Sequence, residues 1–97
     1  MTSKIIRKTL EEAQGLPNAE IDFSDKNLLH LEEMPRLWGM ANVTRLTLAH
    51  NKITEIPPAL ASMENMEILN LFNNTLEEVP TSLSSMPKLR YVKGKCK

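Results

Sequence analysis

The sequence predicts an α/β fold, a solenoid of short parallel β-strands joined by helical or 3-10 returns and preceded by an N-terminal capping helix. Two observations predict it. The first is an internal repeat of 23 residues through the middle and C-terminal parts of the chain. The second is an amphipathic segment over residues 4–14, ahead of the first repeat. With 97 residues, 41% of them hydrophobic and 25% charged, the chain is long enough for one globular domain with a small core.

The repeat emerges when the sequence is shifted by 23 residues against itself. Eight like pairs then coincide: Leu46 with Leu69, Leu48 with Leu71, Asn51 with Asn74, Ile53 with Leu76, Ile56 with Val79, Pro57 with Pro80, Leu60 with Leu83 and Met63 with Met86. So many matches in one register are hard to obtain by chance. The unit that begins at Val43 reads V-x-x-L-x-L-x-x-N-x-I-x-x-I-P-x-x-L-x-x-M, which is the leucine-rich-repeat pattern.

This register divides a single leucine-rich-repeat domain, residues 1–97, into units. We expect an N-terminal cap at about 3–17, repeats at about 18–42, 43–65 and 66–88, and a truncated repeat at 89–97. The first repeat is degenerate, because Ile21 lies 25 residues before Leu46 and Lys26 occupies the asparagine position. The last is incomplete, with Gly94 in place of a leucine and Lys97 in place of the asparagine.

Each position of the unit has a physical reason. Leu46 and Leu48 alternate with outward residues, which is the pattern of a short strand that buries one face. Asn51 and Asn74 follow where the chain turns, and their side chains are expected to bond backbone groups that have no ladder partner. Pro57 holds an extended segment. Apolar pairs spaced three apart then fix a short helical or 3-10 return, namely Leu60 with Met63 and Leu83 with Met86.

The N-terminal segment has helical spacing instead. Its apolar residues are Ile5, Ile6, Leu10 and Ala13. Ser3 is the predicted N-cap, and Gly15-Leu16-Pro17 is the predicted stop. Since a solenoid exposes the apolar side of its terminal repeat, an amphipathic helix is expected to cover the first unit.

The outward strand positions define a predicted protein-binding face. They are Glu20, Asp22 and Ser24, then Arg45, Thr47 and Ala49, then Ile68, Asn70 and Phe72, then Tyr91, Lys93 and Lys95. The face runs from acidic to basic with an apolar centre. Phe72 and Tyr91 are the expected anchors, because aromatic residues often dominate interfaces. The alternative for Phe72 is that its ring packs sideways against neighbouring strands.

No pattern in the sequence predicts catalysis, a cofactor or a metal site. His30, His50 and Cys96 are the residues that commonly act as nucleophiles or metal ligands, and none has the close ligand pair of a zinc motif or a paired base. The three glycines form no phosphate-binding loop. We therefore expect a binding protein that is not an enzyme.

Two other functions stay open. Lys88, Arg90, Lys93, Lys95 and Lys97 form a short basic C-terminal tail, which suggests nucleic-acid binding. Twelve basic residues nevertheless balance twelve acidic ones, so the chain as a whole does not favour a nucleic acid, and we expect none as partner. A regulatory subunit of an enzyme, without catalysis of its own, is the other alternative.

The location follows from two features. A lone cysteine cannot form an internal disulfide, which favours a reducing compartment. No apolar run has the length of a signal peptide or of a membrane span. These features predict a cytoplasmic protein that does not insert into membranes.

Three stretches resemble the opening repeats of the Ras-suppressor group of leucine-rich-repeat proteins: L-T-L-A-H-N-K at residues 46–52, L-N-L-F-N-N at 69–74 and E-E-V-P-T-S-L-S-S at 77–85. The start of the chain, including I-D-F-S-D at 21–25, is similar too. The resemblance implies a cytosolic adaptor that binds the last LIM domain of the adaptor PINCH. It also implies a place in integrin-linked kinase assemblies at cell–matrix adhesions, and restraint of Ras-dependent signalling.

The C-terminal end predicts a further contact. A solenoid that stops near Val92 is expected to leave Leu69, Leu71 and Leu83 thinly covered, and its last strand is an unpaired sheet edge. We therefore expect self-association, or recruitment of a partner, through this end.

Overall fold

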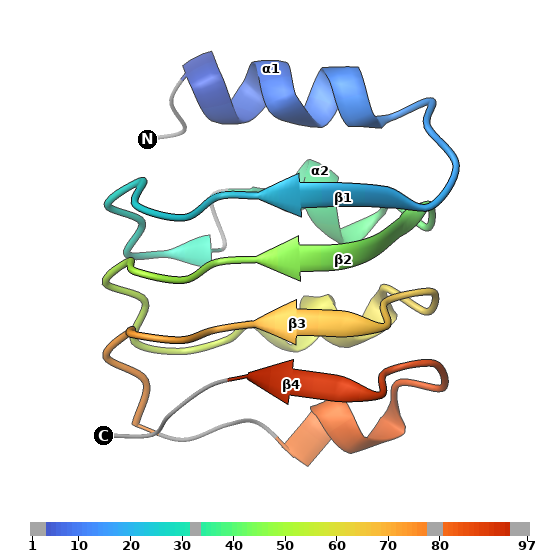
Figure 1. The fold of residues 1–97 in the computed structure, drawn as a ribbon. Helices are drawn as coiled ribbons and strands as arrows, with labels where there is room; N and C mark the ends of the chain where they lie inside the picture. The colour runs from blue at the N-terminus through green and yellow to red at the C-terminus, as the bar shows by residue number, and fades with distance from the viewer. Residues whose placement is uncertain (1–3, 32–33, 78–80, 94–97) are drawn as a thin grey trace.

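A computed structural model describes residues 4–31, 34–77 and 81–93 of the chain. The elements in order are α1 (Lys4–Ala13), β1 (Ala19–Asp22), α2 (Pro35–Trp38), β2 (Val43–Thr47), η2 (Pro58–Ser62), β3 (Ile68–Asn70), η3 (Thr81–Ser85) and β4 (Tyr91–Lys93). Figure 1 shows the strands side by side, with α2, η2 and η3 on one side of the sheet and α1 running along β1. The strands thus form one layer and α2, η2 and η3 a second, while α1 lies at the β1 edge of the sheet.

The sheet has the order β1-β2-β3-β4, and each neighbouring pair is parallel. Leu46 pairs with Leu69, which is the 23-residue shift of the sequence. Ile21 pairs with Leu46, which is the 25-residue shift. The pairing of β1 with β2 is irregular between Ala19 and Glu20, where β2 holds one more residue. The predicted parallel strands and their register are confirmed.

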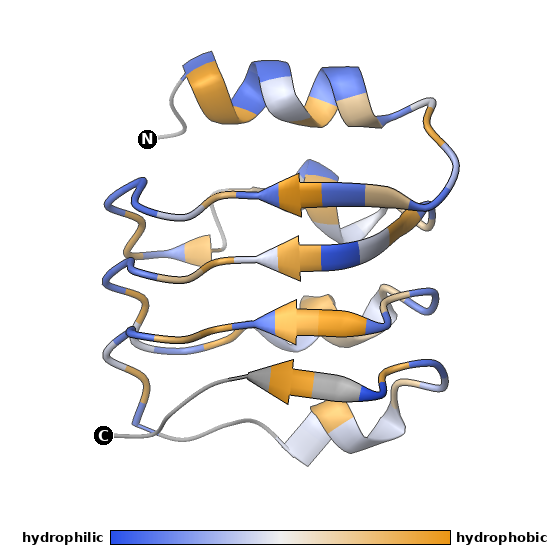
Figure 2. Cartoon of the chain, in the orientation of Figure 1, coloured by the Kyte–Doolittle hydropathy of each residue, from blue (hydrophilic) through white to orange (hydrophobic). Residues whose placement is uncertain are grey.

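The core lies between the sheet and the helical segments. Leu46, Leu48, Leu69 and Leu71 are all 0% exposed, so the L-x-L positions point inward. Figure 2 shows apolar and polar residues alternating along β1, whereas β3 begins with two apolar residues, Ile68 and Leu69. The leucines at the C-terminal end are covered as well, since Leu83 is only 6% exposed. The expectation that Leu69, Leu71 and Leu83 are thinly covered is therefore wrong.

The returns are 3-10 helices in the second and third units. Pro57 is extended, with φ −68° and ψ 147°, and η2 begins at the next residue. The four return residues Leu60, Met63, Leu83 and Met86 are all buried. Val79-Pro80, expected to be extended like Ile56-Pro57, lies outside the described residues. In the first unit the return is the short helix α2 instead, which buries Leu37 and Trp38.

The N-terminal helix α1 contacts β1. It buries Ile6, Leu10 and Ala13, while Ile5 is 62% exposed. The expected stripe that included Ile5 is thus corrected, because consecutive helical residues are rotated by about 100° and only one of an adjacent pair can point at the sheet. Ser3 lies outside the described residues, and Gln14 falls in the turn after the helix.

A row of asparagines at the start of the strands joins successive units. The Asn42 amide Nδ2 donates to the carbonyl oxygens of Ala13, at 2.8 Å, and of Leu16, at 2.7 Å, which ties the end of α1 to the segment that leads into β2. One unit later the Asn65 Nδ2 donates to the Ala41 carbonyl at 2.7 Å. Asn42 and Asn65 are themselves 23 residues apart, so this row obeys the repeat register. The two Asn42 bonds hold the end of α1 against the segment before β2, and the Asn65 bond joins two later units.

Candidate protein-binding face

Six outward side chains of the first three strands gather on the exposed side of the sheet. They are Glu20 and Asp22 of β1, Arg45 and Thr47 of β2, and Ile68 and Asn70 of β3. Together with Ile21 they line a depression of about 270 Å³. We call these six residues the sheet face. The three charged ones are exposed, whereas Thr47, Ile68 and Asn70 are half-buried.

The register arranges the sheet face in two rows that cross the strands. Glu20, Arg45 and Ile68 are neighbours in the first row. Asp22, Thr47 and Asn70 are neighbours in the second. On β4, the backbone of Tyr91 continues the first row and that of Lys93 the second. Acidic, basic and apolar groups therefore follow one another across the sheet.

Two side chains of the second row, Asp22 and Asn70, each accept a backbone N–H from the segment just after their own strand. The Ser24 backbone N–H donates to Oδ1 of Asp22 at 2.9 Å, and the Phe72 N–H donates to Oδ1 of Asn70 at 3.0 Å. The hydrogen bond from the Ser24 side chain lowers the pKa of Asp22, and the backbone bond and the charge of Lys26 lower it further. Burial opposes this shift. Asp22 is thus fixed in position and ionised at neutral pH.

We predict that Ser24→Ala raises the pKa of Asp22 toward its ordinary value of 3.8, because it removes the side-chain hydrogen bond and keeps the backbone one. In the parent, Asp22 adds stability that is present above its ordinary pKa and is lost as the pH falls through the lowered folded value. A carboxyl titration by NMR measures this pKa. An Asp22 pKa that is equal in parent and variant would show that Ser24 is not the cause.

An aromatic residue, Phe72, lies just after the end of β3, next to the sheet face, and is 40% exposed. Its ring meets the ring of His50 edge-on, with centroids 5.9 Å apart. His50 Nδ1 lies 2.8 Å from the Asn73 amide Nδ2. Phe72 therefore makes the sideways contact considered as an alternative and still presents part of its ring to solvent.

The structure departs from the predicted face at its outer positions. Ala49 is only 4% exposed, so it belongs to the interior and not to the face. Ser24 is half-buried. Lys95 lies outside the described residues. Beyond the L-x-L core the chain turns and the strict alternation of a strand ends, so Ala49 is buried directly after the buried Leu48, although it is not a member of the main core cluster.

The turn after each strand is organised by an asparagine. Asn51 is 7% exposed, and its Oδ1 accepts the backbone N–H groups of Lys26, at 2.9 Å, and Leu28, at 3.0 Å. Its Nδ2 donates to the carbonyl oxygens of Phe23, Leu48 and Ala49. Asn74 repeats the arrangement, accepting from the Ile53 N–H at 3.1 Å. Each asparagine thus joins its own turn to the preceding one and supports the strand ends beside Phe72.

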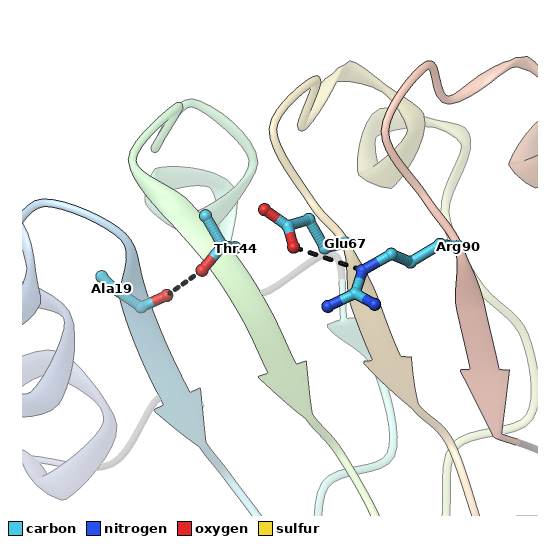
Figure 3. Close-up of polar contacts among 4 residues, drawn as sticks. All are labelled: Ala19, Thr44, Glu67 and Arg90. Carbon is cyan, nitrogen blue, oxygen red and sulfur yellow. Dashed lines mark hydrogen bonds and ion pairs between the residues drawn. The ribbon is translucent and has the colours of Figure 1, made fainter.

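A third row borders the sheet face near the start of the strands. The Thr44 hydroxyl donates to the Ala19 carbonyl at 3.4 Å, and Arg90 Nε lies 3.3 Å from Oε1 of Glu67, as Figure 3 shows. The ion pair is exposed, so it adds little to stability. Lys88 Nζ donates to Oδ1 of Asn65 at 2.8 Å. Two cations of the basic tail are therefore bonded to the preceding unit.

Within residues 4–31, 34–77 and 81–93, no three His, Cys, Asp or Glu side chains lie close enough to hold a metal ion. Cys96 falls outside these ranges. Over the same residues, no helix has the length and apolar character needed to cross a membrane.

A family model described as leucine rich repeat matches residues 41–93, which is more than half of the chain. The chain belongs to the leucine-rich-repeat family. Within that family it is similar to Ras suppressor protein 1 of mouse, at 40% identity over 56 residues, and to the same protein of cow and of human, at 39% identity over 56 residues each. The match covers 58% of this chain and 20% of each relative. The leucine-rich-repeat pattern read from the sequence is confirmed.

Proposed function

We propose that the chain is a non-catalytic module that binds another protein through the sheet face, with Phe72, Tyr91 and Lys93 as its extension. The observation that carries this proposal is the gathering of acidic, basic, amide and apolar side chains around one depression. Such a mixture suits recognition of a protein surface, where polar groups give specificity and apolar groups give affinity.

The architecture supports this use. We propose that the stacked units form a solenoid whose first turn is capped by α1, and that the cap (about 3–17), the three repeats (about 18–42, 43–65 and 66–88) and the truncated repeat (89–97) make one domain. Stacked repeats of this kind hold an open sheet face rigid while its outward residues vary. The turn residues Asn51 and Asn74 have a structural role in this proposal.

The relatives suggest where such a module would act. By its similarity to Ras suppressor protein 1, we propose a role as adaptor or regulator in Ras-type signalling, with a cytoplasmic location. The resemblance in the sequence adds the LIM-domain adaptor PINCH as the proposed partner and cell–matrix adhesions as the proposed site. Because the match spans a fifth of the relatives' length, the partner and location of the whole relatives are proposals for this chain.

Arg45→Ala and Phe72→Ala are expected to weaken partner binding at least fivefold each, because exposed arginine and aromatic side chains commonly anchor interfaces. The melting temperature should change little, since both side chains are exposed. Calorimetric titration with the isolated last LIM domain of PINCH measures the affinity directly. If that domain does not bind, proteins from cytosolic extract that are retained on the immobilised chain are identified by mass spectrometry.

Ser85→Ala is the matched control, because Ser85 lies on η3, on the other side of the sheet, and within the described part of the chain its hydroxyl bonds its own turn, at the Ser82 carbonyl. It should leave partner binding unchanged. Loss of binding in Ser85→Ala, with Arg45→Ala and Phe72→Ala unaffected, would reverse the assignment of faces.

Nucleic-acid binding through the basic tail is the alternative from another functional class. Lys88 and Arg90 are bonded to Asn65 and Glu67, which leaves them less available for phosphate groups. A regulatory subunit of an enzyme would use the same sheet face and would appear in the extract experiment as an enzyme on the immobilised chain.

We also propose self-association through the C-terminal end, supported by fewer features than the sequence predicted. The leucines expected to drive it are buried. What remains is the outer edge of β4, which pairs with no further strand among the described residues, and Val92, which is 38% exposed.

A further inference from the structure

We propose that the sheet face receives an α-helix of the partner that lies across the strands and presents a basic, an acidic and an apolar side chain on successive turns. This inference rests on the proposed function and specifies the shape and charge order of the partner. It follows from three properties of the first row, which consists of Glu20, Arg45 and Ile68. These properties are the order of the three side chains, the absence of ion pairs at the two charged ones among the described residues, and the distance between neighbouring strands.

The order is acid, base, apolar residue, on three strands that are neighbours in register. A complementary partner therefore needs a base, an acid and an apolar group in the same order. Asp22 stands on the same strand as Glu20 but in the second row, where its carboxylate accepts the Ser24 backbone N–H. Thr47 and Asn70, the other two residues of the second row, are uncharged. They therefore favour neither direction in which a partner helix could run across the strands.

The charged groups of the first row are open to a partner. Glu20 and Arg45 are register neighbours and both exposed, yet among the described residues neither side chain forms an ion pair or a hydrogen bond. Arg90 and Glu67, by contrast, are bonded to one another in the bordering row. Ile68 is half-buried, which leaves an apolar contact at the far end of the first row.

The spacing selects a helix. Neighbouring strands lie about 4.8 Å apart, and an α-helix advances about 5.4 Å per turn. Over three strands the two spacings differ by only about 1.2 Å in total, which side chains absorb. A partner strand laid across the sheet would present same-side residues about 6.6 Å apart, so its third residue would miss the third strand by roughly 3.6 Å. A helix fits all three residues at once.

The probe is a helical peptide with lysine, glutamate and leucine at positions i, i+4 and i+7, compared with a peptide in which the lysine and glutamate are exchanged. We expect the first peptide to bind the full chain about tenfold more tightly at low salt, because the exchange turns two attractive charge pairs into repulsive ones. Added salt should reduce this ratio. Fluorescence anisotropy of labelled peptides measures both affinities.

The double variant Glu20→Arg with Arg45→Glu should reverse the preference between the two peptides. It keeps the net charge, and a thermal melt verifies its fold. The matched control exchanges two exposed charges on α1, Arg7→Glu with Glu11→Arg, and should keep the parent's preference.

Equal affinity for the two peptides, no binding of either, or a preference that the double variant does not reverse would overturn the helix inference. The proposed function would still hold if Arg45→Ala and Phe72→Ala bind the partner protein more weakly than the parent does. If partner binding is indifferent to those two variants, the proposed function itself fails.

Discussion

Leu48→Ala and Leu71→Ala are each expected to lower the free energy of unfolding by about 2–5 kcal/mol. Both side chains are 0% exposed and lie at equivalent positions of successive units, so truncation leaves a cavity that the stacked neighbours cannot fill. Small domains have a total stability of about 5–15 kcal/mol, so either change should shift the melt strongly. Thermal and urea unfolding followed by circular dichroism measure the effect.

Ile5→Ala is the control for this experiment, since it truncates an apolar side chain that is 62% exposed. It should change the free energy of unfolding by no more than about 0.5 kcal/mol. Parent-like stability of Leu48→Ala and Leu71→Ala would mean that these leucines do not face the core and that the repeat register is shifted.

Asn51→Ala is expected to lower the free energy of unfolding by about 3 kcal/mol or more. The substitution removes five hydrogen bonds. The Lys26 and Leu28 N–H groups and the Phe23 carbonyl lose this partner, whereas the Leu48 carbonyl still accepts from Asn74 Nδ2 and the Ala49 carbonyl still accepts from the Asp25 N–H. A buried polar group without a partner costs about 1–3 kcal/mol, and water entering the turn would satisfy some of these three groups. Urea unfolding gives the value, and hydrogen exchange shows whether the Lys26 and Leu28 amides lose protection.

Asn74→Ala provides the comparison, because Asn74 is half-buried and Asn51 is 7% exposed. The same loss of an amide should therefore cost less at Asn74, where water replaces it more easily. A larger destabilisation at Asn74 than at Asn51 would contradict the view that burial determines the cost.

The features that repeat were predictable from the sequence. Leu46 and Leu69 carry the same pattern one unit apart, so the 23-residue shift alone predicts their pairing in register. The outward positions on either side of the first leucine follow from alternation, which is why Arg45 and Ile68 are predicted to share one face. Short-range periodicity and a fixed shift are sufficient for both inferences.

Features outside that periodicity were missed or misplaced. Helix α2 lies in the degenerate first unit, where Pro35 starts a helix that no other unit contains among the described residues. Ala49 was placed outward because alternation was extended beyond the strand, into the turn that buries it. The row formed by Asn42 and Asn65 does follow the 23-residue shift, and comparing the polar positions between units would have found it.

The proposal that the sheet face binds a protein is tested most directly by mapping the contact on the chain itself. Amide spectra of the isotopically labelled chain are recorded with and without the LIM domain, or with the protein recovered from extract if that domain does not bind. We predict that the largest shifts fall on Asp22, Arg45, Thr47, Ile68 and Asn70, while Ser62 and Ser85 stay unchanged. Shifts confined to η2 and η3, with the strands unaffected, would contradict it.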